Sequence, residues 1–360
     1  MRQSPGGMMA QAFLGSLGVA ILSLIVPQAA AQTTGTKPIV WMGPPGAQDG
    51  KCFRELFEHP DEWKETRSII DVLFYAGQNI DKQFKDDEMK SWFAMMKQWG
   101  LKLGLEVGAV KPWGKTGEEV FNKERPMWER IQRLGGDISA IAMDEPLKCC
   151  RMDIDKPDDY AVQETANFIA LVRKNFPRIQ IGDIETYPSI PLKDHYWWIE
   201  ALNKRLAEMK VRGLDFYRLD VNWAVFVVRN EGSWKEVREL ERHCREKNLP
   251  FSLIYWAAGY PALQRKGIAD DATWYVSIMQ QGYDYALVDG APDEYVIESW
   301  VGAPSRSVPE TGDFTFTRSV RDFVRTFVTK NHIAPQAPPL PPKPKPRRTP
   351  AAKPPSDATS

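Results

Sequence analysis

The chain has 360 residues, and its 47 Lys and Arg balance its 47 Asp and Glu, so the formal net charge is zero. The balance is uneven, because the C-terminal segment 334–360 carries five Lys or Arg against one Asp, and Arg2 adds one more positive charge. The remaining chain therefore carries about five net negative charges, which argues against nucleic acid as a ligand.

The first 31 residues are predicted to be a secretory signal peptide. Arg2 gives a weak positive start, Ala12–Val26 is a largely apolar stretch, and Ala29–Ala31 supplies the small residues that signal peptidase reads. An uncleaved membrane anchor would need a longer apolar core, of roughly 20 residues. We therefore expect cleavage after Ala31 and a secreted or periplasmic protein with no stable membrane insertion.

The C-terminal segment 334–360 is rich in Pro, Lys and Arg and contains no aromatic residue. Such a composition cannot bury a hydrophobic core, so we expect a disordered, extended tail. Residues 32–333 remain for the fold. Their number suits one barrel domain, which typically needs ~250 residues, and we expect a monomer.

The cysteines do not indicate a metal site. None of the four is spaced as Cys-x-x-Cys, and the chain has only four His, so we expect neither zinc nor another cofactor. In an exported protein a disulfide is feasible. We expect Cys52 to pair with Cys149 or Cys150, so that at least one of these two vicinal cysteines stays free.

Short apolar runs rich in β-branched residues alternate with longer amphipathic stretches. The predicted strands are Pro38–Met42, Ile69–Tyr75, Leu101–Val107, Ile138–Asp144, Ile179–Thr186, Leu214–Val221, Phe251–Trp256 and Tyr295–Trp300. Helical spacing is clearest in Asp159–Asn175, Ser233–Lys247 and Asp271–Tyr285. This alternation predicts parallel strands joined by crossover helices, and eight units fit a closed (β/α)₈ TIM barrel. No GxGxxG or P-loop pattern follows the first strand, which removes the usual nucleotide-binding interpretation.

Acidic and aromatic residues gather where the predicted strands end. Those that end or follow strands three to eight are Glu106, Asp144, Glu145, Glu185, Tyr187, Asp220, Trp223, Trp256, Glu298 and Trp300. A lone acid in such a place is more often a helix cap. Chemistry in barrels occurs at the carboxyl ends of the strands, so acids on five strand ends predict a functional site there.

Alternation along the fifth and sixth strands indicates which side chains point inward. On the sixth strand the alternate residues Tyr217, Leu219 and Val221 are apolar and suit the helix layer. Arg218 and Asp220, which lie between them, therefore point inward. On the fifth, Asp183 and Glu185 share a phase, and we expect them to face inward too. Asp183 and Arg218 are then predicted to form an internal ion pair beneath the two acids. Alternatively, all four belong to one stabilising network.

The run Ala140–Pro146 (AIAMDEP) resembles the fourth-strand motif of the large retaining glycosidase clan, in which Asn-Glu-Pro ends the strand. The segments Gly182–Pro188 and Leu219–Trp223 resemble secreted bacterial barrels of glycosidase type. The first resemblance implies that Glu145 is the proton donor. It also places Asp144 where the clan's Asn contacts a sugar hydroxyl.

The chain departs from that clan at the seventh strand, where the clan places its nucleophilic Glu and this sequence has no carboxylate. The partner of Glu145 must come from another strand. Glycoside hydrolysis uses carboxyl groups ~5–5.5 Å apart for retention and ~6.5–9.5 Å apart for inversion. We therefore rank Glu185 first, Asp220 second and Glu298 third, because some barrels that resemble the α-amylases pair fourth-strand and fifth-strand acids.

Two acids suit sugar chemistry, because the leaving oxygen needs a proton while the anomeric centre or its attacking water needs an anion. Glu106, Glu298 and the aromatic residues at the strand ends are then predicted to bind a carbohydrate substrate. A second hypothesis is a barrel that binds glycan without cleaving it. A third is a metal-dependent enzyme of enolase type using Glu106, Asp144 and Glu185, although the chain lacks room for that family's N-terminal domain.

Overall fold

Strands and helices alternate along the chain in the computed structural model, which describes residues 37–328. The strands are β1 (Ile39–Gly43), β2 (Val72–Ala76), β3 (Lys102–Val107), β4 (Ile138–Asp144), β5 (Gln180–Tyr187), β6 (Phe216–Val221), β7 (Phe251–Tyr255) and β8 (Glu294–Glu298). All neighbouring strands pair in parallel, and β8 pairs with β1, so the sheet closes on itself. The predicted TIM barrel is confirmed.

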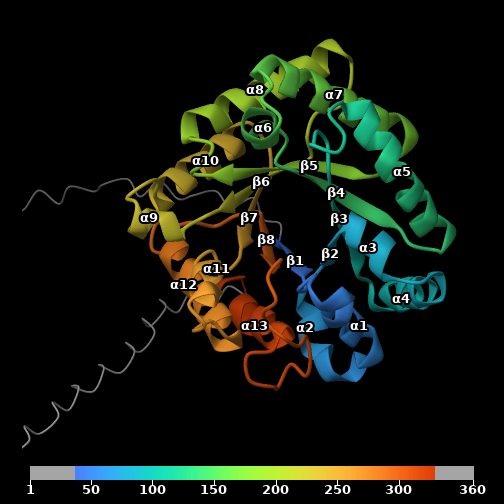
Figure 1. Cartoon of the computed structure of the whole chain (residues 1–360), viewed down its shortest axis with the longest axis vertical. Coiled ribbons are helices and arrows are strands. Elements are labelled where there is room, and N and C mark those ends of the chain that lie inside the picture. Colours follow the sequence, from blue (N-terminus) through green and yellow to red (C-terminus); the bar gives the residue numbers. More distant parts are fainter. Residues whose placement is uncertain (1–36, 329–360) are drawn as a thin grey trace, which may run out of the picture. The chain divides into compact units, whose positions relative to one another are not determined.

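Helices surround this sheet on its outer side (Figure 1). The longer ones are α1 (Lys51–Glu58), α4 (Asp86–Trp99), α5 (Gly117–Arg133), α7 (Asp158–Asn175), α8 (Leu192–Glu208), α10 (Trp234–Glu246), α12 (Asp271–Ala286) and α13 (Phe316–Phe323). Shorter helices are α2 (Lys64–Ile69), α3 (Gly77–Gln83), α6 (Pro146–Lys148), α9 (Ala224–Val228) and α11 (Tyr260–Arg265). Single turns cover Gln48–Gly50, Pro60–Trp63, Cys149–Asp153 and Val324–Val328.

Local sequence explains where several helices begin. Thr116 precedes α5, and its hydroxyl accepts the backbone N–H of Glu119 at 3.1 Å, while the Glu119 carboxylate reaches back to the Thr116 N–H at 3.4 Å. Asp270 caps α12 in the same way, through the N–H of Thr273 at 2.7 Å. Such boxes satisfy backbone donors that have no partner inside the helix.

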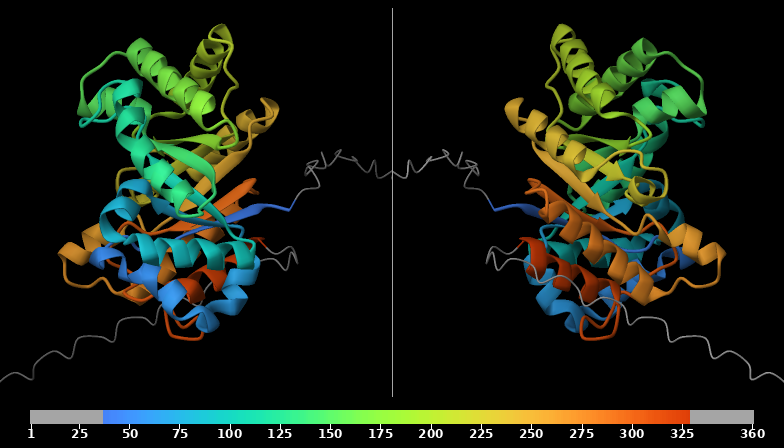
Figure 2. Two further views of the ribbon diagram at one scale, coloured as in Figure 1. Left: turned by 90° about the vertical axis from the view of Figure 1, so that its right-hand side faces the viewer. Right: turned by 90° about the vertical axis from the view of Figure 1, so that its left-hand side faces the viewer.

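The beginning and the end of the helix layer also meet, which closes the outer layer (Figures 1 and 2). Helix α13 packs beside α2. Between them the Glu310 carboxylate accepts the backbone N–H of Glu65 at 3.0 Å and that of Thr66 at 2.7 Å. The chain after β8 is thereby fixed to the chain that precedes β2.

Two hydrophobic cores result from the alternation of side chains along the strands. Between sheet and helices lies the larger core, which includes Tyr217, Leu219 and Val221. Inside the barrel lies a smaller one, composed of Trp41, Val72, Phe74, Ala140, Ala142, Ile184, Phe216, Ile254, Trp256 and Val296. The barrel interior is therefore filled by side chains rather than open.

The predicted disulfide is wrong, because all four cysteines are buried free thiols. Cys52 lies on α1, after β1, and its thiol donates to the carbonyl of Pro304 at 3.7 Å. Cys149 and Cys150 follow β4, three strands further around the barrel.

Two predictions concern segments outside the described residues: the signal peptide at 1–31 and the tail at 334–360. Within residues 37–328, no helix has the length and apolar character needed to cross a membrane.

Candidate active site

Four acids point into the barrel near its carboxyl-terminal mouth. The pairing register gives their direction, because cross-strand partners in a parallel sheet share a face. Asp144 is level with Ile184, and Ile184 belongs to the interior core. Asp220 lies two residues beyond Arg218, the β6 partner of Ile184. Glu298 lies two residues after the interior residue Val296 on β8, so it points inward as well. Glu106 lies two residues after Gly104, the β3 partner of the interior residue Phe74, and also points inward.

Glu145 lies directly after β4 and occupies a left-handed backbone conformation, with φ 50°. This conformation is costly for a residue with a side chain and recurs at functional sites. The Glu145 carboxylate is 3.1 Å from the ammonium group of Lys148, and it remains partly exposed at the mouth. Its neighbour Asp144 forms a separate ion pair with Lys111, which lies in the loop after β3.

Burial and crowding raise the pKa of most of these acids. Burial is the largest cause for Glu106, and the charges of Asp144 and Glu298 add to it, so the pKa of Glu106 lies well above its usual value. Burial likewise raises the pKa of Glu298 to about 7, although the Arg218 guanidinium opposes the rise.

The pKa values of Asp220 and Glu145 are also raised. Burial is the main cause for Asp220, followed by the charge of Glu145, and the Trp256 ring N–H partly opposes both. For Glu145, burial and the charge of Asp144 outweigh the opposing effect of Lys148. Because ionisation of one of these acids opposes ionisation of its neighbours, their protonation states are coupled. Shifted pKa values of this kind are common in catalytic centres.

Arg218 is completely buried beneath these acids. Its guanidinium lies 4.2 Å from the ring centre of Trp41 and forms an ion pair with Glu294 at 3.3 Å. It also donates to the Ser252 hydroxyl at 2.9 Å. The predicted pair with Asp183 is wrong, because Asp183 points to the helix layer and accepts the Trp198 ring N–H at 2.6 Å.

Glu185 lies two residues after Asp183 on β5, so its side chain also points outward and does not reach the mouth. Its side chain is fully buried and accepts the backbone N–H groups of Leu147 at 2.6 Å and Lys148 at 3.2 Å. The prediction that Glu185 faces the barrel interior is wrong. The carboxylate set of an enolase-like site is therefore not assembled, since its fifth-strand member is missing.

Tyr187 also lies in the outer layer. It is buried, its hydroxyl binds Glu236, and it accepts the backbone N–H of Ser233 at 3.1 Å. The structure thus places Tyr187 away from the mouth, where it was expected to bind substrate.

The three predicted tryptophans do meet at the mouth. The ring centres of Trp256 and Trp300 are 4.3 Å apart, and Trp223 donates its ring N–H to the Trp256 carbonyl at 3.1 Å. Trp256 is buried, while Trp300 is 46% exposed. Trp300 therefore offers an indole surface of the kind that packs against the apolar face of a sugar ring.

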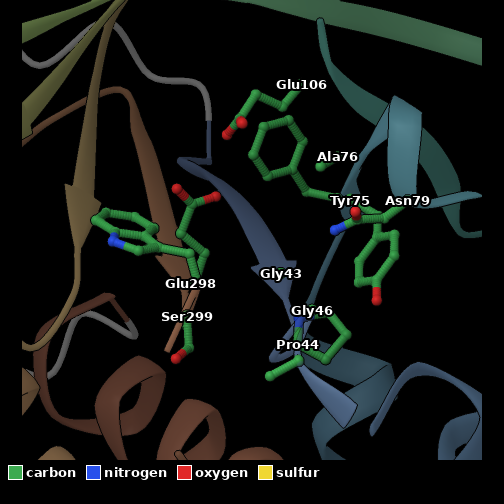
Figure 3. Close-up of a pocket in the computed structure, with 12 residues that line it drawn as sticks. Gly43, Pro44, Gly46, Tyr75, Ala76, Asn79, Glu106, Glu298 and Ser299 are labelled. Carbon is green, nitrogen blue, oxygen red and sulfur yellow. The ribbon is translucent and has the colours of Figure 1, made fainter. Parts of the chain in front are cut away.

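A pocket of about 250 Å³ opens beside this cluster, between β8 and the first three strands. It is lined by Gly43, Pro44, Gly46, Ala47, Phe74, Tyr75, Ala76, Asn79, Glu106, Glu298, Ser299 and Trp300. Figure 3 shows the carboxylates of Glu106 and Glu298 directed into the space between β8 and β3. Sequence reasoning predicted both acids but not Asn79 or Ser299, which follow their strands without any distinguishing pattern.

Sequence reasoning also missed Lys111 and Lys148, the cations that hold the two acids at the end of β4. Lys148 had an available signal, since it lies three residues after Glu145, the spacing of neighbours on one helical face. Lys111 had none, because its loop reaches Asp144 only through the tertiary fold. In the range 37–328, no three or more His, Cys, Asp or Glu side chains are grouped as metal ligands.

Comparison with known proteins yields no family. No protein-family model matches the chain. No curated protein matches it either.

Solved structures with the same fold do match. A D-psicose 3-epimerase has 12% identity and a TM-score of 0.45, over 80% of this chain and 98% of its own. Xylanase10C from Cellvibrio japonicus has 9% identity and a TM-score of 0.49, over 81% and 71%. The YdjI aldolase from Escherichia coli K12 has 10% identity and a TM-score of 0.40, over 80% and 87%. Their three chemistries differ, and likeness at this level carries no inference about activity.

Proposed function

We propose that this protein is a glycoside hydrolase in which Glu145 and Asp220 form the acid pair. The observation that carries the proposal is their placement at one mouth, where the charge of Glu145 is the largest electrostatic cause of the raised Asp220 pKa. Cleavage of a glycosidic bond needs both a proton donor and an anion on the reacting side of the sugar. Two interacting carboxyl groups divide these roles, because ionisation of one opposes ionisation of the other.

Glu145 is assigned as the proton donor, on the resemblance of its strand end to the retaining glycosidase motif. Its raised pKa keeps it protonated to higher pH than an ordinary glutamate. When Glu145 holds the proton, its charge no longer opposes the ionisation of Asp220. Burial still opposes that ionisation and the Trp256 ring N–H only partly offsets it, so the positive charge that develops on the sugar must favour the Asp220 anion. Asp220 then acts on the anomeric carbon or on its water.

The remaining groups suit a carbohydrate substrate. Asp144 is held by Lys111 beside the donor and can accept a sugar hydroxyl. Trp300 supplies an exposed indole face backed by Trp256. The second hypothesis, a barrel that binds glycan without cleaving it, uses the same surfaces. Incubation with a panel of bacterial and plant glycans, measured as release of reducing ends, separates cleavage from binding.

Leaving-group dependence tests the pair. A donor is needed most when the leaving group is poor, and general acid catalysis contributes typically 10²–10⁴-fold. Glu145→Gln should therefore lose activity on natural glycans and retain more of it on aryl glycosides with activated leaving groups. Asp220→Asn should lose activity on both, because the anion is required whichever group departs.

Glu129→Gln is the matched control, since Glu129 lies exposed on α5 and should leave both activities unchanged. If Glu145→Gln cleaves natural glycan at the wild-type rate, Glu145 is not the donor. If instead Asp220→Asn shows the leaving-group dependence, the two acids exchange roles.

A further inference from the structure

The pocket beside the acid pair contains a buried acceptor with no partner. Glu298 is 5% exposed, and its Oε1 atom makes no hydrogen bond within the described residues. The neighbouring strand β1 leaves room for this side chain, because a side chain at Gly43, the register partner of Glu298, would meet the Glu298 Cβ at 2.8 Å. A buried, unsatisfied carboxylate oxygen costs free energy unless a donor reaches it. The pocket is thus built to receive a donor from a ligand.

The two cations that act on these acids are already bound within the protein. Arg218 lies below the pocket and is bound to Glu294 and Ser252, although its Nη1 atom has no partner among residues 37–328, and Lys111 is bound to Asp144. Two hydroxyls in the pocket wall already donate elsewhere. Tyr75 donates to Gln83 at 2.9 Å, and Ser299 donates to the Ala303 carbonyl at 2.5 Å.

The facing carboxylates of Glu106 and Glu298 therefore meet in a pocket whose ionisable lining residues other than Tyr75 are both acids, while its remaining side-chain donors, the Asn79 amide and the Trp300 ring N–H, are neutral (Figure 3). A ligand with several N–H donors and a positive charge complements such a pocket best, since a primary ammonium group has three donors and no acceptor. Hydrogen bonds in which both partners are charged are also the stronger ones.

We propose that this pocket is a subsite for a protonated primary amine on a sugar ring, so that the ligand is an amino sugar with a free amine, such as glucosamine. The inference rests on the proposed function, because it names the sugar on which that function acts. The pocket volume of about 250 Å³ suits one ring rather than a longer chain. The partly exposed indole of Trp300 lines the same pocket and can pack against the apolar face of the ring.

Proton release gives this proposal a distinct signature. The pKa of Glu298 is raised to about 7, so near pH 7 the empty pocket holds bound protons. An ammonium group favours the ionised carboxylates and should expel a proton when it binds, whereas a neutral sugar should not. The charged groups that act on the two acids are Asp144, Arg218, Asp220 and Lys111.

Titration calorimetry near pH 7 tests the proposal with glucosamine, glucose and N-acetylglucosamine as probes. We expect glucosamine to bind about ten-fold or more tightly than either neutral sugar, because hydrogen bonds to a charged group are worth more than neutral ones. Its apparent enthalpy should change with the ionisation enthalpy of the buffer, as in phosphate against Tris. Equal binding of the three sugars, binding of none, or binding of glucosamine without proton release would each overturn the inference.

Variants locate the effect in the pocket. Glu298→Gln and Glu106→Gln should each remove the preference for glucosamine over glucose, while Glu129→Gln keeps it. If a variant fails to fold, proton release by the wild-type protein still decides the matter. Failure of the two proposals is distinguishable. Cleavage of neutral glycans without glucosamine binding refutes only the subsite, and glucosamine binding without any cleavage refutes only the hydrolase.

Discussion

At the scale of single residues, the end of β4 separates two adjacent acids by giving each its own cation. Asp144 turns inward to Lys111, while Glu145, in its left-handed conformation, turns to Lys148. The two carboxylates therefore differ in environment although they are neighbours in sequence. Such a difference allows adjacent acids to take different roles at the same pH.

Lys148 lowers the pKa of Glu145, and the pH profile of activity can measure this effect. The ammonium charge favours the ionised form, so Lys148 lowers the pKa that burial raises. Lys148→Met should raise the pKa of Glu145 further and keep the donor protonated to higher pH. We expect the alkaline limb of the kcat/KM profile to move to higher pH.

The exposed pair of Lys247 and Glu200 supplies the control, and Lys247→Met should leave the profile unchanged. A shift of the acidic limb in Lys148→Met, instead of the alkaline one, would show that Glu145 works as the anion.

At the scale of elements, the strands were predictable and the direction of β5 was not. The eight predicted runs match the observed strands to within three residues at either end, because apolar runs bounded by turns and helices are strong local signals. The polar residues Arg218 and Asp220 face inward on β6, whereas Asp183 and Glu185 face outward on β5. In the helix layer these two acids accept hydrogen bonds from the Trp198 ring and from the backbone N–H groups of α6.

One residue in β5 agrees with the observed direction of the strand. A side chain at Gly182 would lie 1.9 Å from the Phe216 ring, on the crowded interior side that the even-numbered residues of β5 face. Glycine inside a strand often marks such a close approach. The prediction from polar alternation did not consider this glycine, because Asp183 and Glu185, two residues apart, suggested that their side of the strand faces the active site.

Glu185 is thus predicted to support the mouth from outside. Its carboxylate accepts the first free N–H groups of α6, the turn that follows Glu145. Glu185→Ala leaves those buried donors without a partner, and an unsatisfied buried group costs about 1–3 kcal/mol. We expect a clear fall in Tm for Glu185→Ala and a smaller one for Glu185→Gln, which keeps one acceptor oxygen.

Activity separates this support from catalysis. Folded Glu185→Gln should show no more dependence on the leaving group than the wild-type protein. If Glu185→Ala keeps the wild-type Tm and loses all activity on aryl glycosides, Glu185 belongs to the reacting centre.

At the scale of the whole molecule, the barrel follows from the sequence more fully than the site does. Strand–helix alternation and chain length suffice for the fold, because both are local or global properties of the sequence. The site depends on pairs far apart in the chain, such as Arg218 with Glu294 and Lys111 with Asp144. Spacing cannot reveal these pairs.

Concentrating acids inside one barrel has a consequence for stability. Folding raises the pKa of Glu298 from the ordinary 4.5 to about 7, so the folded state binds this proton more tightly than the unfolded state. The stabilisation is fully present below pH 4.5 and is lost as the pH rises through about 7. Since one pKa unit corresponds to about 1.4 kcal/mol, the loss amounts to a few kcal/mol.

Comparison of Tm for the wild-type protein and Glu298→Gln across this pH range isolates the effect, because the amide does not titrate. The wild-type protein should lose stability relative to the variant between pH 4.5 and about 7, and the difference should level off above that. Burial is the largest cause of the raised pKa, while Arg218 opposes it. If the wild-type protein gains stability relative to Glu298→Gln in this window, the Arg218 charge outweighs burial, and Glu298 is ionised in the folded barrel.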